Sequence, residues 1–165
     1  MAEVDLVDET FIAVPPARLV PIVADPAQWR RWWPDLDLEI FMNRGNEGIR
    51  WSMRGALVGS CEIWLEAVLD GTLVHYYLRG VPSAARTGEA EPFPDTPAGW
   101  RQAAKLRATR ARAWKVAVWA LKDACEGTRR AGEPPPAESA ADQSAESDPV
   151  SANEESSKQT PTPGK

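Results

Sequence analysis

The sequence predicts an α+β domain in which an antiparallel sheet packs against one long C-terminal helix. Four segments between residues 36 and 79 alternate apolar and polar side chains, a pattern typical of half-buried strands. Residues 97–127 repeat apolar side chains at helical spacing. Three of the eight tryptophans, Trp29, Trp32 and Trp33, lie close together just before the strands. Because each can bury roughly 150–250 Å², the fold must offer them a broad apolar surface.

The chain is predicted to begin with a strand and two short helices. Residues 4–14 are rich in β-branched and other apolar side chains, which favour a strand. The Pro-Pro pair at 15–16 ends this strand and suits the first turn of a short helix. Asp25 is placed to cap the tryptophan helix, which Pro34 ends.

An antiparallel meander follows. Its first strand places one set of apolar residues on a single face, namely Leu36, Leu38, Ile40 and Met42. The next strands cover residues 49–55, 59–69 and 72–79, and Asp70-Gly71 indicates a hairpin between the last two.

Residues 80–96 are rich in turn-forming residues and predict a loop. Thr96 then caps a helix with Pro97 at its first position, and Gly127 is a natural stop. A helix of that length spans about 45 Å, so it can cross a whole small sheet.

Composition divides the chain into a domain over residues 1–130 and a tail over residues 131–165. The domain carries equal numbers of acidic and basic residues, whereas the tail holds seven acids and two lysines in a Pro/Ser/Glu-rich sequence. Such a segment cannot bury enough apolar surface to fold, so we expect a disordered acidic tail. We expect neither a signal peptide nor a membrane span, and hence a cytoplasmic location. Cys61 and Cys125 are expected to be small core residues.

The order of these elements resembles the helix-grip fold of the START-related SRPBCC superfamily, in particular its polyketide cyclase/dehydrase and lipid-transport family of actinobacterial type. The similar segments are residues 10–20, 24–34 with a Pro-x-x-Trp pattern, 62–66 followed by 70–77, and 97–127. The resemblance covers residues 4–127. It implies a curved antiparallel sheet wrapped around the long C-terminal helix, with an apolar space between them. Family members usually have six strands after the second helix. The four strands predicted here therefore imply a smaller or more open cavity.

That space is where the resemblance places a hydrophobic or amphipathic small molecule, such as a lipid or a polyketide-like compound. Alternation and helical spacing nominate the lining residues: Trp33, Leu38, Ile40, Trp51, Met53, Ile63, Leu65, Tyr76, Leu78, Trp114, Val118 and Leu121, with Val74 beside them. Trp29 and Trp32 are expected to plug the open end of the sheet, and Trp33 to border the cavity mouth. The same residues could equally form a filled core.

Catalysis is the first alternative. A cyclase would need groups that polarise a carbonyl and move protons, and Arg50, Arg54, Tyr76 and Tyr77 are the available candidates. His75 is the only histidine, and no Ser/His/Asp grouping can be assembled around it. One histidine and two distant cysteines do not make a metal site, and we expect no cofactor.

The second alternative is a module that binds protein or RNA through the basic helix. Residues 101–115 hold six cations and no acid. A solvated helix face is the simpler interpretation, and the sharper one is contact with an anionic surface through Arg107, Arg110 and Arg112. Nucleic acid is not the expected partner. The acidic tail could also fold back transiently over these cations.

Overall fold

A computed structural model describes residues 4–136 of the chain. The predicted tail therefore falls mostly outside the described residues. Within them, no helix is long and apolar enough to cross a membrane.

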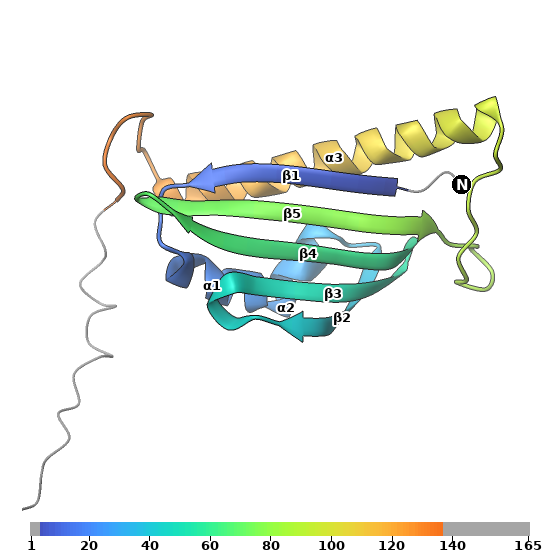
Figure 1. Cartoon of the computed structure of the whole chain (residues 1–165), viewed down its shortest axis with the longest axis horizontal. Helices are drawn as coiled ribbons and strands as arrows, with labels where there is room; N and C mark the ends of the chain where they lie inside the picture. Colours follow the sequence, from blue (N-terminus) through green and yellow to red (C-terminus); the bar gives the residue numbers. More distant parts are fainter. Residues whose placement is uncertain (1–3, 137–165) are drawn as a thin grey trace, which may run out of the picture.

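Five antiparallel strands form one curved sheet in the order β1-β5-β4-β3-β2 (Figure 1). They are β1 (Val4–Ile12), β2 (Leu36–Asn43), β3 (Gly48–Gly55), β4 (Leu57–Val68) and β5 (Gly71–Pro82). Four strands follow the second helix, as the sequence predicted. Ala56 alone joins β3 to β4, and Gly55 makes this turn possible with φ at +102°. A Cβ at Gly55 would lie 2.5 Å from the carbonyl oxygen of Asp35, so only glycine fits.

Local signals correctly predicted where the three α-helices begin and end. They are α1 (Pro16–Ala24), α2 (Pro26–Trp32) and α3 (Pro97–Glu126). A short 3-10 helix, η1 (Gly45–Glu47), was not predicted and lies between β2 and β3. Asp25 accepts the Ala27 N–H at 2.8 Å at the start of α2. Thr96 accepts the Gly99 N–H at 3.2 Å at the start of α3.

All three α-helices cover one face of the sheet. The long helix α3 lies beside β1, α1 packs against β3 and β4, and α2 contacts both α1 and α3 (Figure 1). The hydrophobic core fills the space between, and alternation along each strand divides the residues between the two faces. On β5, Val74, Tyr76 and Leu78 are buried against the helices, whereas His75 and Tyr77 belong to the outer face.

One predicted face is wrong. Residues from Leu36 to Ile40 alternate as expected, and Ile40 pairs with Trp51. A β-bulge then follows, so that Met42 pairs with Arg50, an outer-face residue, instead of continuing the apolar face. The bulge adds one residue at Phe41 and thereby reverses the side on which each later residue points.

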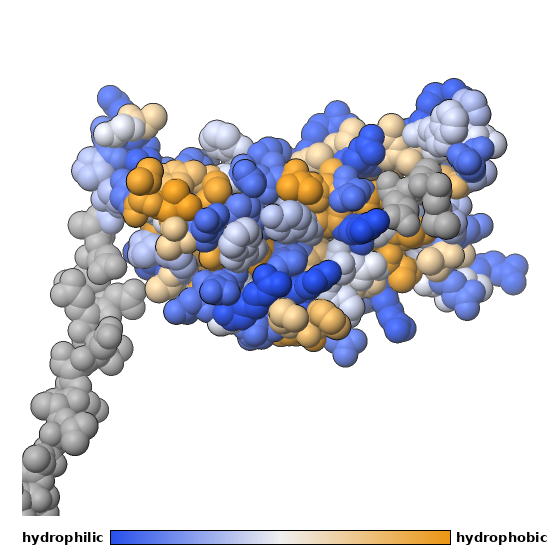
Figure 2. Space-filling model, viewed as in Figure 1, coloured by the Kyte–Doolittle hydropathy of each residue, from blue (hydrophilic) through white to orange (hydrophobic). Residues whose placement is uncertain are grey.

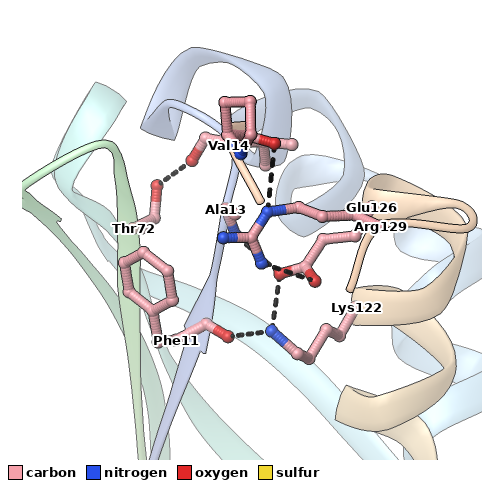
Figure 3. Close-up of polar contacts among 8 residues, drawn as sticks. Phe11, Ala13, Val14, Thr72, Lys122, Glu126 and Arg129 are labelled. Carbon is pink, nitrogen blue, oxygen red and sulfur yellow. Dashed lines mark hydrogen bonds and ion pairs between the residues drawn. The ribbon is translucent and has the colours of Figure 1, made fainter. Parts of the chain in front are cut away.

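A buried carboxylate joins the end of α3 to the start of the chain (Figure 3). Glu126 Oε1 accepts the backbone N–H of Ala13 at 2.7 Å and the Lys122 ammonium at 2.5 Å. Lys122 also donates to the carbonyl oxygen of Phe11 at 2.7 Å, and Arg129 lies 3.6 Å from Glu126 Oε2. These contacts hold the C-terminal turn of α3 against the junction between β1 and α1.

Candidate functional site

Stacked aromatic rings occupy the space between the sheet and α3. Trp33 stacks on Tyr76 and on Trp114, with centroids 5.9 Å apart in both pairs, and meets Trp51 edge-on at 5.8 Å. Its indole N–H donates to the Tyr76 hydroxyl at 3.2 Å. Trp33 is only 3 % exposed, so it is the centre of the core rather than the border of a cavity mouth. The chain turns at Trp33, the C-terminal cap of α2, and the ring points inward.

Ten of the twelve predicted lining residues are buried in this core. They are Trp33, Trp51, Met53, Ile63, Leu65, Tyr76, Leu78, Trp114, Val118 and Leu121. Leu38 is half-buried against them. Ile40 shares their face of the sheet but is 46 % exposed, because it lies on the edge strand β2.

Burial changes the acidity of two groups in this core. It raises the pKa of the Cys61 thiol to about 12, so the thiol stays protonated. It also raises the pKa of the Tyr76 phenol, which therefore stays neutral. The indole N–H of Trp51 is buried without a hydrogen-bond partner, and its ring meets Trp29 edge-on. The rings thus form an apolar packing unit with no ionised group.

A groove of about 660 Å³ lies outside this core, between α3 and the α1–α2 pair. From α3 it is lined by Leu121, Val116 and four alanines, Ala113, Ala117, Ala120 and Ala124. The other wall holds Ile22, Gln28, Arg31, Trp32 and Pro34. Small side chains on α3 keep the groove wide, and most of its surface is apolar.

Trp32 separates this groove from the aromatic core. It lines the groove on one side and meets Trp33 and Trp114 edge-on at 5.6 and 6.0 Å on the other. Of the predicted lining residues, only Leu121 reaches the groove. The sequence did indicate an apolar surface at the groove, since Val116, Ala117 and Ala120 extend the apolar side of α3 beyond the residues that face the core. This pattern on α3 does not show which residues form the opposite wall of the groove.

The cations of α3 fall into two groups. Arg110 makes a bidentate ion pair with Asp35, at 2.8 and 2.6 Å, and this hydrogen-bonded arginine lowers the pKa of the Asp35 carboxyl. Lys115 pairs with Asp8 at 2.5 Å. Arg110 therefore holds α3 to the turn between α2 and β2 and is not free for an anionic surface, whereas Arg107 and Arg112 are exposed.

The groups nominated for catalysis lie on opposite faces of the sheet. Tyr76 faces the core, while Arg50, Arg54 and Tyr77 belong to the outer face, which Figure 2 shows to be mainly hydrophilic. His75 is also on the outer face, between Glu9 at 3.1 Å and Glu66 at 2.9 Å. The sheet separates these groups from Tyr76, so they cannot act on one substrate together.

Comparisons with known proteins identify the fold. Neither a protein-family model nor a curated protein matches the sequence. A polyketide-cyclase-like protein of Corynebacterium glutamicum superposes with a TM-score of 0.52 at 15 % identity, over 75 % of this chain and 92 % of that one. An aromatase/cyclase of Streptomyces sp. R1128 gives 0.43 at 16 % identity over 79 % and 98 %. A START superfamily protein of Mycobacterium smegmatis gives 0.38 at 14 % over 71 % and 98 %. The likeness to the first confirms the predicted α+β helix-grip fold.

Proposed function

We propose that this protein binds an amphipathic small molecule, non-catalytically, in the groove between α3 and the α1–α2 pair. The observation that carries the proposal is the groove itself, which at about 660 Å³ has the size of a small-molecule site. Its walls are apolar apart from Gln28 and Arg31 on one side. A ligand with a hydrocarbon chain or fused rings and one anionic group matches this distribution.

The packing of the aromatic core favours the groove, rather than the interior between the sheet and α3, as the ligand site. A molecule between the sheet and α3 would have to displace Trp33 from contacts with four other rings. The groove needs no such rearrangement. The predicted lining residues other than Leu121 could contact a ligand only if the stacked rings around Trp33 moved apart. Their role in binding therefore stays a prediction.

The polar groups of the groove favour binding over catalysis. A guanidinium and an amide can orient a carboxylate or a carbonyl, but neither accepts a proton near neutral pH. Arg31 is the anion partner in this proposal because its planar guanidinium can donate two parallel hydrogen bonds to a carboxylate.

Titration with a fluorescent polyene fatty acid, cis-parinaric acid, tests the proposal. The full chain should bind it, and Ala117→Trp, which fills the groove, should weaken binding at least tenfold. Ala104→Trp is the matched control, since Ala104 is exposed on the same helix and does not line the groove. Equal affinities of the two variants would place the ligand elsewhere.

Displacement of this probe by palmitate and by hexadecanol tests the role of Arg31. Charge-assisted hydrogen bonds contribute about 1.5–3 kcal/mol. Arg31→Gln should therefore weaken palmitate roughly tenfold or more and leave hexadecanol nearly unchanged. An equal loss for both competitors would mean that Arg31 packs against the chain rather than pairing with the headgroup.

A further inference from the structure

One side of α3 combines exposed cations with exposed apolar side chains. An α-helix turns by about 100° per residue, which places Arg101, Lys105, Arg112 and Trp119 within about 60° of Val116 around the helix axis. We call these five residues the cationic stripe. Val116 is 73 % exposed and Trp119 is 54 % exposed. Val116 also lines the apolar groove, so these two side chains extend the apolar surface of the groove along the helix.

The charges of the stripe are available for a partner. Within residues 4–136, Arg101, Lys105 and Arg112 make no ion pair, in contrast to Arg110 and Lys115. The acids of α3 are Asp123, one turn beyond Trp119, and the buried Glu126. The stripe therefore carries a clear excess of positive charge.

The stripe also borders the groove, because Val116 belongs to both. Across the groove, Arg31 on α2 is exposed as well. The groove thus has the cation Arg31 on its α2 wall, and Val116 on its α3 wall connects it to the cationic stripe and to Trp119 one turn further along the helix. Tryptophan is the side chain that best suits a water–hydrocarbon interface, since its ring is apolar and its N–H is polar.

We propose that the cationic stripe binds the surface of an anionic lipid bilayer. Arg101, Lys105 and Arg112 contact the headgroups, while Val116 and Trp119 enter the interfacial layer and the groove opens toward the membrane. Charge complementarity and interfacial side chains together favour a bilayer over a protein partner. The proposal rests on the proposed function only in treating the groove as the ligand site.

Cosedimentation of the full chain with vesicles tests this proposal. An equal mixture of phosphatidylcholine and phosphatidylglycerol should bind the protein at low salt, and phosphatidylcholine alone should bind it far less. Each neutralised cation should lower partitioning about fivefold. Combined substitution of Arg101, Lys105 and Arg112 by glutamine should therefore reduce it about a hundredfold.

The matched control is Arg54→Gln combined with Arg86→Gln, which removes exposed cations away from α3. This control should bind like the unmodified chain. Equal binding of the stripe variant and the control would overturn the proposal. So would salt-sensitive binding to a short RNA duplex without binding to the anionic vesicles.

Trp119→Ala separates insertion from simple charge attraction. It should weaken vesicle binding several-fold. It should also abolish the quenching of the protein's tryptophan fluorescence by brominated lipids. Unchanged quenching would contradict interfacial insertion. The bilayer and ligand proposals fail separately, because the stripe variant should bind cis-parinaric acid normally and Ala117→Trp should still bind vesicles.

Discussion

At the scale of single residues, Trp33 shows how adjacent tryptophans take different roles. Trp33 contacts three other rings in the core, whereas Trp32 lies between the core and the groove. Trp29 is half-buried and donates its indole N–H to the carbonyl oxygen of Val23 at 2.7 Å. The cluster therefore connects α2 to the sheet, to α3 and to α1 through separate side chains.

Trp33→Ala should destabilise the fold more than Trp29→Ala. Truncating a large buried aromatic residue costs about 3–5 kcal/mol, since it removes apolar contacts and leaves a cavity. Truncating the half-buried Trp29 should lower the free energy of unfolding by about 2 kcal/mol, because part of its ring is already in water. Urea denaturation followed by circular dichroism measures both. A larger loss for Trp29 would contradict the central position of Trp33.

The sequence could predict that these tryptophans are buried but not which one is central. Trp29 and Trp32 lie on one short helix and Trp33 is its C-cap. Their order of burial depends on the turn at Trp33 and on the rings of Trp114 and Tyr76, which are distant in sequence. Met42 shows a similar limit. Alternation indicated a regular strand, but no local signal revealed the bulge beside it.

At the scale of elements, α3 is fixed along its length by polar contacts. Arg110 pairs with Asp35 in the middle, Trp114 donates to Asp8 at 3.0 Å, and Glu126 binds the Ala13 N–H at the end. The helix boundaries were predictable, because capping is a local interaction. The partners of Arg110 and Glu126 were not, because they lie 75 and 113 residues away.

Glu126→Gln should destabilise the protein near neutral pH by about 3 kcal/mol, since it removes one partner of a buried ion pair. Burial by itself would raise the pKa of the Glu126 carboxyl. The hydrogen bonds from Lys122 and the Ala13 N–H, with the Lys122 and Arg129 charges, outweigh burial and lower it. A lowered folded-state pKa contributes stability above the unfolded value of about 4.3, and this contribution is lost as pH falls below it.

The difference in unfolding free energy between Glu126→Gln and the unmodified chain should therefore shrink on acidification below about pH 4. Urea denaturation at a series of pH values measures it. Glu47→Gln, at an exposed carboxyl in η1, serves as the control and should show a small, nearly constant difference. A constant difference for Glu126→Gln would mean that its carboxylate charge contributes nothing.

At the scale of the whole molecule, the fold class and strand number followed from periodicity, whereas the position of the groove did not. The groove depends on how far α2 stands from α3, and that spacing depends on Trp32, Asp35 and Arg110 acting together. The family resemblance implied a ligand between the sheet and the helix, where the large rings pack in the structure. Ring bulk was visible in the sequence, but the way the rings stack is a property of the assembled core.

The acidic tail is expected to oppose the binding of the cationic stripe to an anionic bilayer. Residues 137–165 contain six acids and two lysines, so ending the chain at residue 136 removes most of its net negative charge. This truncation should strengthen binding to anionic vesicles several-fold at low salt, because the tail acids repel the bilayer and compete for the same arginines and lysine. The gain should vanish near 1 M salt, where the Debye length falls to about 3 Å. Replacing the six acids by Gln and Asn in the full-length chain should reproduce the gain, whereas equal vesicle binding of all three proteins at low salt would show that the tail does not act on the stripe.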